Sequence, residues 1–454
     1  MNLAGKKVVV AGTGKSGIAA AKLLLQIGAS VVLFDENEQV KEEQVMGQFP
    51  SDSMITLVVG KMTKELAQSA ACMVISPGIS IEAPFTEYFR NADVPIWSEV
   101  ELAYRFGKGK LAAITGTNGK TTTTTLVGEL LEAYYDSVYV VGNIGTPYTE
   151  ASLQMKDNTV TVAEISSFQL ESIDAFHPQV SAVLNVTPDH LNRHHTMEIY
   201  ADTKMEIAAN QTADEICVLN YDDELTRAMA DRIKAKPLFF SRLTDLADGI
   251  CLQGDSIVMK QDNQVIAKVC ERQELKLLGE HNIENVMAGI AIAYYMGVPL
   301  DIIHNVVVQF KAVEHRIEYV DTIEGVDYYN DSKGTNPDAA IKGIQAMVKP
   351  TVLIAGGYDK KVAFDEWIQA FGGKVRSLIL IGVTAPLIAE TAKKYDFHDI
   401  IMAASLEDAV KKAYEQAKEG DAVLLSPACA SWDMFDSYEQ RGELFKQYVG
   451  NLKG

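Results

Sequence analysis

The sequence predicts an α/β protein with mostly parallel sheets, and three observations support that fold class. Short apolar, β-branched runs alternate with longer amphipathic segments from one end of the chain to the other. The runs are continuously apolar, which is typical of strands that helices cover on both faces. The chain has 454 residues, enough at roughly 150 residues per domain for about three domains.

The predicted strands share this apolar character and are bounded by turn-forming or polar residues. In chain order they are KKVVVAG, SVVLFD, CMVISPG, KLAAITG, SVYVVGN, TVTVAEIS, VSAVLNVT, EICVLNYD, PTVLIAGG, SLILIG and DAVLLSP. Between residues 237 and 278 apolar residues alternate with polar ones instead. We therefore expect a small antiparallel patch in that segment.

Two boundaries divide the chain into the expected domains. The first lies near residue 98, where the strand VPIWSE gives way to VELAYRFGKGK before a new strand begins. The second lies near residue 312, after the helical segments HNIENVMAGIAIAYYMGV and LDIIHNVVVQF. We predict an N-terminal domain over 1–98, a central domain over 99–312 and a C-terminal domain over 313–454.

The composition argues against several classes of protein. The formal net charge is −20, so we expect no nucleic-acid partner, because a phosphate backbone requires a basic surface. The five cysteines are scattered without a C-x-x-C pair, which favours reduced thiols over disulfides or zinc. The sequence shows neither a signal peptide nor an apolar run of about 18 residues, so we expect no membrane association and a cytoplasmic location.

A first glycine loop, GTGKSG, spans Gly12 to Gly17 between a predicted strand and a predicted helix. Asp35 ends the next predicted strand. In the dinucleotide-binding pattern, the loop backbone and the helix N-terminus receive a phosphate while such an acid reaches a sugar hydroxyl. A tight strand-to-helix turn without a ligand is the alternative interpretation.

A second glycine loop lies in LAAITGTNGKTTTTTL, again between a predicted strand and a predicted helix. Gly116 and Gly119 allow the backbone to wrap around a phosphate, Lys120 neutralises charge, and the Thr121 hydroxyl suits Mg²⁺. The first glycine of the usual P-loop pattern is replaced by Ile114. The setting still predicts a site for a nucleoside triphosphate.

Further motifs follow in a fixed order: GNIGTP, EISSFQL, NVTPDHLNRH, GEHNIENVMAG, HRIEYV and NDSKGTNPDA. Together with GTNGKTT they resemble the Mur ligase family of ATP-dependent amide-bond-forming enzymes, over essentially the whole chain. The resemblance implies a Rossmann-like N-terminal domain for a UDP group, a central P-loop ATPase domain, and a Rossmann-like C-terminal domain that brings an amino acid. The motifs GTGKSG, SPGI and LLSPACASWDMFDSYEQRGELF resemble those of members that join D-glutamate to UDP-N-acetylmuramoyl-L-alanine.

The implied reaction explains why cations should gather in the site. ATP must first convert a carboxylate to an acyl phosphate, which the amine of the amino acid then attacks. Two unit charges about 4 Å apart repel by roughly 4 kcal/mol at an effective dielectric constant of about 20. Positive charge must therefore dominate where the carboxylate meets the γ-phosphate.

The resemblance assigns catalytic roles to particular positions. Lys120 and Lys333 are expected to face the β- and γ-phosphates, and Thr121 and Glu164 to hold one Mg²⁺ ion. Glu164 with His190 is expected to hold a second ion beside the carboxylate. On pattern alone, Glu164 reads as a solvated residue after a strand, and His190 as a surface histidine.

Lys204, in YADTKMEIAANQ, has two interpretations. Its pattern is that of a helix lysine that extends its amine to solvent. The resemblance instead places it where family members carry a carbamylated lysine, whose carboxylate helps to bind the second Mg²⁺. We therefore predict a carbamylated Lys204, and we expect the nearby His194 and His195 at the surface.

The resemblance also implies binding residues for each substrate. ATP is expected to contact Gly116, Thr117, Asn118, Gly119, Lys120, Thr121, Thr122, Asn285, Arg316, Asp331 and Lys333. The UDP group is expected to contact Lys15, Ser16, Asp35, Ser76 and Gly78, with Asp35 on the uracil or sugar. The muramoyl-alanine end is assigned to Asn143 and Gln169, and D-glutamate to Thr335, Lys360 (or Lys361), Ser431 and Tyr438.

Other functions remain open at this point. The chain could add a different amino acid, although the N-P-R signature of the diaminopimelate-adding members is absent, or it could add glutamate to a folate. A nicotinamide-dependent oxidoreductase would explain the first glycine loop but not GTNGKTT or NDSKGTN. A P-loop regulatory protein would not need Glu164, His190 and Lys204. We expect a monomer acting on small molecules.

Overall fold

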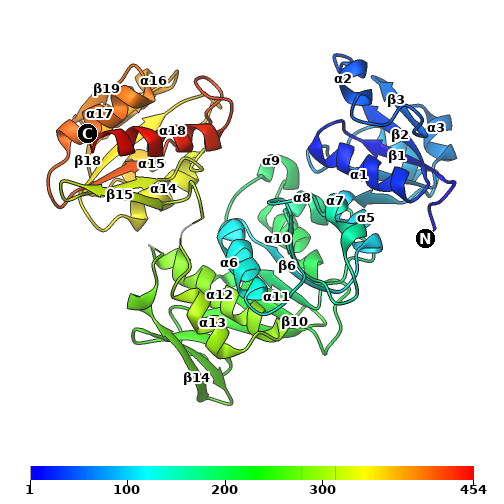
Figure 1. The fold of residues 1–454 in the computed structure, drawn as a ribbon, viewed down its shortest axis with the longest axis horizontal. Coiled ribbons are helices and arrows are strands. Elements are labelled where there is room, and N and C mark those ends of the chain that lie inside the picture. The colour runs from blue at the N-terminus through cyan, green and yellow to red at the C-terminus, as the bar shows by residue number, and fades with distance from the viewer. Residues whose placement is uncertain (1, 278, 312, 454) are drawn as a thin grey trace. The chain divides into compact units, whose positions relative to one another are not determined.

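The computed structural model describes residues 2–277, 279–311 and 313–453. It contains three sheets of five, nine and six strands, shown with their helices in Figure 1. Most strand pairs are parallel, which confirms the predicted α/β class. The chain forms two compact units, of which one holds the first two sheets and the other, from Gln309 onward together with Leu275–Asn282, holds the third.

The N-terminal sheet is fully parallel, with strand order β3-β2-β1-β4-β5. Its strands are β1 (Lys7–Ala11), β2 (Ser30–Asp35), β3 (Ile55–Val59), β4 (Cys72–Ile75) and β5 (Ile96–Ser98). Its helices are α1 (Lys15–Gln26), α2 (Glu42–Met46), α3 (Lys64–Ser69) and α4 (Thr86–Arg90). The strand order changes direction between β1 and β4, the position where open α/β sheets bind ligands.

The central sheet has the order β14-β13-β12-β11-β10-β9-β6-β8-β7. Its strands are β6 (Lys110–Thr115), β7 (Val138–Gly142), β8 (Val160–Glu164), β9 (Val180–Val183), β10 (Ile216–Asn220), β11 (Lys236–Ser241), β12 (Gly249–Gln253), β13 (Ser256–Gln261) and β14 (Gln264–Glu271). The last three form the antiparallel patch predicted for this region, although Leu278 at the end of that segment lies outside the described residues.

The helices of the central part connect these strands. They are α5 (Glu99–Phe106), α6 (Lys120–Glu132), α7 (Tyr148–Ala151), α8 (Ser167–Leu170), α9 (Leu191–His194), α10 (Met197–Met205), α11 (Glu224–Met229), α12 (Glu280–Met296) and α13 (Leu300–Val307). Short 3₁₀ turns are η1 (Ser152–Gln154), η2 (Glu206–Ala208) and η3 (Arg272–Glu274). Helix α6 begins directly after the second glycine loop, as the sequence predicts.

The C-terminal sheet has the order β15-β16-β20-β17-β18-β19, with an antiparallel pair at one edge. Its strands are β15 (Glu318–Ile323), β16 (Val326–Asn330), β17 (Thr351–Gly356), β18 (Val375–Ile381), β19 (Ile400–Met402) and β20 (Ala422–Leu425). Its helices are α14 (Pro337–Ala346), α15 (Asp365–Gln369), α16 (Ala385–Lys394), α17 (Leu406–Gln416) and α18 (Tyr438–Asn451).

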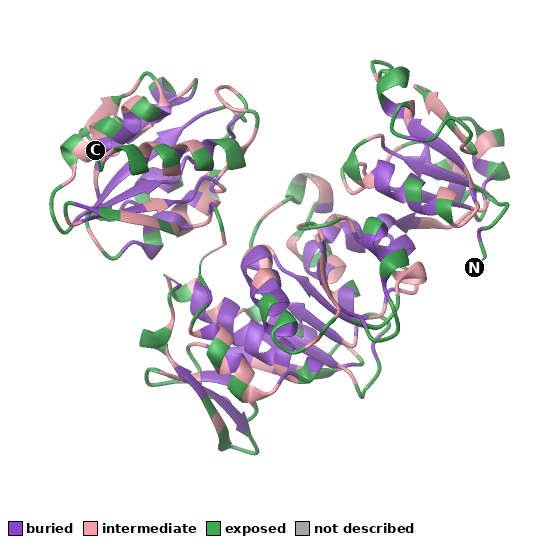
Figure 2. Cartoon of the chain, in the orientation of Figure 1, coloured by how far each residue is buried: buried purple, intermediate pink, exposed green. Residues whose placement is uncertain are grey.

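The core lies where the continuous apolar runs predicted it. The strands of the three sheets are largely buried, and exposed residues follow the outer faces of the helices (Figure 2). All six residues of β17 are buried, for example, because helices cover both faces of a parallel sheet. The predicted strands omit the edge strands β3 and β19. They also omit the hairpin β15–β16, whose apolar residues occur singly or in pairs between polar ones.

Two further expectations concern thiols and membranes. All five cysteines are buried and unpaired, which confirms the prediction of free thiols. Within the described residues, no helix has the length and apolar character needed to cross a membrane. The domain limit predicted near 98 falls at the end of β5, whereas residue 312 lies outside the described residues. Both limits remain predictions.

Candidate active site

Several predicted site residues lie at one edge of the central sheet. The loop 116–119 follows β6, Glu164 ends β8, Asn143 follows β7, and Asn185 lies just beyond β9. Strands β9, β6, β8 and β7 are direct neighbours and run parallel. Their carboxyl ends therefore meet at the same edge, where ligands of α/β proteins bind.

The glycine loop has a backbone that only glycine adopts easily. Gly116 and Gly119 have φ angles of +153° and +84°. A Cβ on Gly119 would lie 2.2 Å from Oδ1 of Asn285, so the ATP-binding candidate Asn285 lies directly against the loop. The Lys120 ammonium donates to the carbonyl oxygens of Gly116, at 2.7 Å, and Thr117, at 3.0 Å. The loop thus combines a helix N-terminus with a cation, which suits a phosphate.

Asn185 fixes the shape of this loop, and the sequence analysis did not single it out. Its Oδ1 accepts a hydrogen bond from the Asn118 backbone N–H at 2.8 Å, and its Nδ2 donates to the Asn118 carbonyl at 3.1 Å. The Asn185 carbonyl also accepts from the Thr117 N–H. Its position in NVT, directly after an apolar strand, is the signal that could have identified it.

Four of the five threonines that follow Lys120 form two groups. Thr121 and Thr122 lie in the first turn of α6, next to the loop, and are the two that the sequence assigns to ATP. Thr123 and Thr124 are completely buried, and their hydroxyls have no hydrogen-bond partner among the described residues. These two therefore fill the interior beneath the loop.

Glu164 has the environment expected of a cation ligand. It is buried, and its Oε1 accepts a hydrogen bond from Asn143 Nδ2 at 2.7 Å. Its Oε2 is also buried and has no hydrogen-bond partner within the described part of the chain. A buried, ionised oxygen is costly unless it is paired or coordinates a metal. The carboxylate therefore fits a hard cation such as Mg²⁺.

His190 caps the N-terminus of α9 in a left-handed backbone conformation, with φ of +53°. Its ring packs edge-on against Phe168, with the ring centroids 4.8 Å apart, and 47% of its side chain is exposed. Burial lowers the pKa of His190, Asp189 opposes the shift, and the ammonium group of Lys120 lowers the pKa further. The imidazole is thereby kept neutral, as a metal ligand must be.

Lys204 is buried, with 1% of its surface exposed, so the interpretation of a solvent-reaching helix lysine is wrong. Its Nζ lies 4.5 Å from the centroid of the Tyr200 ring. Burial, followed by the positive charge of Lys120, holds the pKa of Lys204 well below its usual range, and Asp189 acts in the opposite direction. Within the described residues, no carboxylate forms an ion pair with this amine.

His194 corrects a second expectation, because it is buried and not at the surface. Its ring stacks on Phe168, and its Nε2 is 2.9 Å from Oγ of Ser167. The one-turn helix α9 packs its inner face on α8 and α10, a tertiary contact that residue types alone do not reveal. His195 is exposed, as expected, and lies beside Glu82.

The N-terminal domain forms a comparable loop at the switch point of its sheet. Gly17 must be glycine, since a Cβ there would lie 1.9 Å from the Gly12 carbonyl oxygen. Lys15 and Ser16 begin α1 directly after this turn, so their backbone N–H groups belong to the helix N-terminus. The loop has the geometry expected for a phosphate or sugar.

Of the three other predicted UDP contacts, Ser76 and Asp35 lie beside this loop. Ser76 follows β4, and its buried hydroxyl has no hydrogen-bond partner among the described residues. It faces Gly12, where an added Cβ would come within 2.6 Å of it. Asp35 accepts hydrogen bonds from the N–H and hydroxyl of Thr13, at 3.1 and 2.6 Å. Gly78 follows two residues after Ser76, and a Cβ added there would have no atom within 4 Å.

Gln169 is placed differently from the other substrate candidates. It is buried, its Oε1 accepts from the N–H and hydroxyl of Ser166, and its Nε2 donates to Glu99 at 2.8 Å. Both ends of the amide are thus engaged inside the protein, in a capping box for α8. Its contact with the muramoyl-alanine end stays a prediction.

The C-terminal unit carries the remaining nucleotide candidates. Asp331 follows β16 and is buried, and its Oδ2 accepts a hydrogen bond from the Ser426 hydroxyl at 2.6 Å. Burial raises the pKa of Asp331 to about 7, although Ser426 and the Arg316 charge lower it. Arg316 therefore lies close enough to interact with Asp331 electrostatically.

Arg441 connects the two loops that carry Lys333 and Ser431, and it was absent from the predicted site. It is fully buried, and it donates to the hydroxyl and carbonyl of Ser332 at 2.9 and 2.8 Å and to the Cys429 carbonyl at 3.2 Å. Lys333 Nζ lies 5.6 Å from the Tyr438 ring centroid. The structure thus brings Lys333 and Tyr438 together, with Thr335 two residues further along the same loop.

Lys360 and Lys361 differ in their surroundings. Lys361 Nζ pairs with Asp359 at 2.5 Å and is exposed. Lys360 Nζ instead lies 5.3 Å from the ring centroid of Trp432, the residue after Ser431. Of the two lysines, Lys360 is therefore the one that lies next to the Ser431 loop.

The raised pKa of Asp331 leads to a prediction about stability. Because the folded-state pKa of about 7 exceeds the ordinary value of 3.8, the folded protein holds a proton that the unfolded chain releases, and stability falls as the pH rises from 4 to 7. We expect Asp331→Asn to raise Tm at pH 8, by about 2–4 °C for each kcal/mol of relieved cost. Calorimetry at pH 4 should show a much smaller difference, and a difference independent of pH would contradict the prediction.

Three family models together match most of the chain. The Mur ligase MurD-like N-terminal domain matches residues 6–98, the Mur ligase middle domain residues 114–293, and the Mur ligase glutamate ligase domain residues 315–429. Among solved structures, MurC from Thermotoga maritima aligns with a TM-score of 0.61 and 18% identity, over 98% of this chain and 100% of that one. The MurF ligase of the same organism aligns with a TM-score of 0.60 and 20% identity, over 99% and 96% of the two chains. These two structures show a shared fold.

Relatives of known name are much more similar in sequence. Proteins named UDP-N-acetylmuramoylalanine–D-glutamate ligase from Lachnoclostridium phytofermentans and Lachnospira eligens are each 51% identical to this chain, over 100% of both lengths. The protein of that name from Clostridioides difficile is 45% identical over its full length. The chain therefore belongs to the Mur ligase family, among relatives named UDP-N-acetylmuramoylalanine–D-glutamate ligases.

Proposed function

We propose that this protein joins D-glutamate to UDP-N-acetylmuramoyl-L-alanine and converts ATP to ADP and phosphate. The identity of the substrates rests on the full-length relatives that carry this name. The chemistry rests on one observation above all: a buried Glu164 carboxylate with an unpartnered oxygen lies at the same sheet edge as the Lys120 loop. That arrangement suits a nucleotide whose phosphates are bound together with a divalent cation.

The proposed reaction has two steps. A carboxylate oxygen of the UDP-linked substrate forms a bond to the γ-phosphorus of ATP, and the bond from that phosphorus to the β-phosphate bridging oxygen breaks, which releases ADP. The amine of D-glutamate then attacks the carbonyl carbon of the acyl phosphate. The tetrahedral species collapses with loss of phosphate and of the amine proton, which leaves an amide.

The protein's own residues supply binding and orientation. The 116–119 loop and the first turn of α6, which includes Lys120, hold the β- and γ-phosphates, and Lys333 is assigned to the same groups. Asn285, Arg316 and Asp331 are assigned to adenine and ribose. The UDP-linked substrate is assigned to Lys15, Ser16, Asp35, Ser76, Gly78, Asn143 and Gln169. D-glutamate is assigned to Thr335, Lys360, Ser431 and Tyr438.

Two Mg²⁺ sites are part of the proposal. Thr121 and Glu164 would hold one ion, and Glu164, His190 and Lys204 in its carbamylated form would hold the other. When bound, Mg²⁺ supplies positive charge that reduces the repulsion between the carboxylate and the phosphates. The neutral His190 ring and the unpartnered Glu164 oxygen support these assignments.

Carbamylation requires a neutral amine, and the surroundings of Lys204 favour one. Burial and the Lys120 charge lower the pKa of Lys204, so the lone pair is available to attack the carbon of CO₂. The new N–C bond forms while one N–H proton is released to water, and the side chain gains one negative charge. A buried neutral amine near Lys120 would thereby become an anion that Lys120 attracts.

Phosphate release tests the function directly. Purified protein with ATP, Mg²⁺ and UDP-N-acetylmuramoyl-L-alanine should release phosphate only when D-glutamate is present. EDTA should abolish the release, and excess Mg²⁺ should restore it, because the phosphates and the carboxylate then regain their counter-charge. Release that depends on L-lysine or diaminopimelate would instead indicate another amino-acid-adding ligase, and turnover that requires NADH would contradict the proposal.

We also expect the protein to act as a monomer in the cytoplasm. The cytoplasmic location is expected from the scattered cysteines of the sequence, which favour reduced thiols. Sedimentation equilibrium measures the mass in solution, and a mass near twice the 49.7 kDa of the chain would contradict the first expectation.

A further inference from the structure

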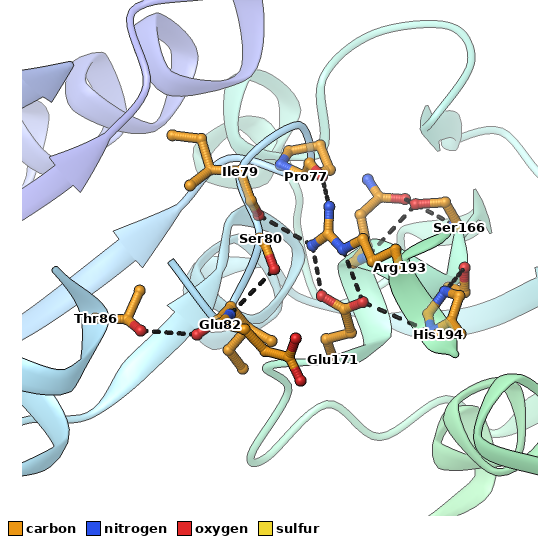
Figure 3. A network of polar contacts seen from close by, with 12 residues as sticks. Pro77, Ile79, Ser80, Glu82, Thr86, Ser166, Glu171, Arg193 and His194 are labelled. Atoms are coloured by element: carbon orange, nitrogen blue, oxygen red, sulfur yellow. Dashed lines mark hydrogen bonds and ion pairs between the residues drawn. The ribbon is translucent and has the colours of Figure 1, made fainter. Parts of the chain in front are cut away.

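Arg193 is at the centre of a polar network outside the assigned binding residues, shown in Figure 3. It lies in α9, three residues after His190, and 14% of its side chain is exposed. Its Nε donates to Oε1 of Glu171 at 3.0 Å, and a terminal nitrogen pairs with Oε2 of the same carboxylate. This two-pronged ion pair fixes the plane of the guanidinium.

The other donors of Arg193 reach the N-terminal domain. Its terminal nitrogens donate to the carbonyl oxygen of Pro77 at 2.8 Å and to that of Ile79 at 3.0 Å. These two carbonyls flank Gly78 in the segment assigned to the UDP-linked substrate. A lysine ammonium cannot donate to two carbonyls and a carboxylate that lie in one plane. The planar guanidinium of arginine can, because its donors point in fixed directions within that plane.

The guanidinium face of Arg193 contacts Phe168, which packs against the proposed metal ligand His190. The guanidinium carbon lies 4.1 Å from the centroid of the Phe168 ring. Phe168 in turn packs edge-on against His190, at 4.8 Å between centroids. A continuous set of contacts therefore joins the Pro77–Ile79 backbone, Arg193, Phe168 and His190.

We propose that Arg193 is a positioning residue that aligns the 76–79 loop with His190, so that the UDP-linked substrate presents its carboxylate where activation occurs. The proposal rests on the function proposed above. Arg193 contacts backbone carbonyls and a carboxylate of the protein itself, so its effect on the reaction is indirect. Glu171 is the anchor that keeps the guanidinium in the required plane.

Arg193→Gln and Arg193→Lys test the role against a matched control. Arg232→Gln removes an exposed arginine that pairs with Asp202 on the same domain. For Arg193→Gln we expect the KM of UDP-N-acetylmuramoyl-L-alanine to rise about 10- to 100-fold, since charged hydrogen bonds to two carbonyls are lost. The KM of ATP should stay unchanged, Arg193→Lys should fall between the wild type and Arg193→Gln, and Arg232→Gln should match the wild type.

A second measurement does not depend on activity. Hydrogen–deuterium exchange of the peptide covering residues 76–86, with no nucleotide added, should be faster in Arg193→Gln and in Glu171→Gln than in the wild type. A merely structural role would raise all KM values together or lower Tm without this local change. If exchange and the KM of the UDP-linked substrate both match the wild type, the proposal is overturned.

The two failures are distinguishable. If the wild type itself shows no D-glutamate-dependent phosphate release, the proposed function is wrong, and the exchange experiment still decides whether Arg193 orders the 76–79 loop. If the wild type is active but Arg193→Gln behaves like Arg232→Gln, only the positioning role is wrong. Should Arg193→Gln fail to fold, Glu171→Gln, which keeps the shape of the anchor, carries the same comparison.

Discussion

Replacing Lys204 by alanine is expected to lower D-glutamate-dependent phosphate release at least about 100-fold, because removal of groups that bind or orient a metal typically costs 10- to 100-fold or more. Lys204 is buried and has no ion-pair partner among the described residues, so its amine is not needed to balance a carboxylate. Substitution of a lysine with a purely structural role would instead lower Tm and leave the activity of the folded protein unchanged. Steady-state phosphate release at saturating substrates provides the measurement.

Chemical rescue separates the carbamate from other roles of Lys204. Removal of the side chain leaves room beside Tyr200 for a small carboxylate, so formate or acetate should restore part of the lost activity in Lys204→Ala. The wild type should lose activity when CO₂ and bicarbonate are depleted, whereas the alanine variant should be insensitive to this depletion. The responses differ because the wild type obtains the negative charge from CO₂ as a carbamate, whereas the alanine variant obtains it from the added carboxylate.

Lys236→Ala is the control for this substitution, since Lys236 is exposed at the start of β11. It should retain wild-type activity and show no response to formate. Turnover of Lys204→Ala at the wild-type rate would contradict the carbamate. Lys204→Ala could instead lose activity without rescue by formate or acetate, while its residual activity depends on bicarbonate as strongly as that of the wild type. That result would show that the modified group lies elsewhere.

The sequence predicted the parts of the fold that depend on local patterns. Continuous apolar runs identified most of the buried parallel strands, although not the partly exposed edge strands β3 and β19, and glycine spacing located the loops at 12–17 and 116–119. Both signals are local, because a buried strand and a positive φ each constrain the residues that form them. The hairpin β15–β16 lacked that signal, since many of its residues are only partly buried and its apolar residues occur singly or in pairs.

The supporting residues of the site could not be predicted in the same way. Asn185, Arg193 and Arg441 each form a hydrogen bond to the backbone of a loop that is distant in sequence. Their roles depend on which strands become neighbours in the fold, and the residue types alone do not predict this arrangement. The burial of Lys204 and His194 has the same origin, because it arises where α9 and α10 pack together.

Two buried glutamates show how charge distinguishes support from function. Glu101 is fully buried and accepts hydrogen bonds from the backbone N–H groups of Asp174, Ala175 and Phe176, each at 2.9 Å. It also pairs with Arg105 at 2.6 Å. Both oxygens of the Glu101 carboxylate have partners within the protein. One oxygen of Glu164, in contrast, has no hydrogen-bond partner in the described structure.

Glu164→Gln and Glu101→Gln should therefore have opposite effects. Glu164→Gln preserves the acceptor for Asn143 and removes a buried charge, so Tm should not fall, while activity should drop at least about 100-fold as a metal ligand is lost. The half-saturating Mg²⁺ concentration of any residual activity should also rise. Glu101→Gln breaks a buried ion pair, which costs about 3–5 kcal/mol, so Tm should fall by at least about 6 °C.

Calorimetry and Mg²⁺-dependent phosphate release on the two variants make the comparison. The pair is matched, since each substitution exchanges one buried carboxylate for an amide of nearly the same shape. A large fall in Tm for Glu164→Gln would show that its charge supports the fold, and the proposed metal site would lose its main support. If Glu164→Gln instead keeps its stability and loses its activity, the unpartnered oxygen is explained by a cation that the reaction requires.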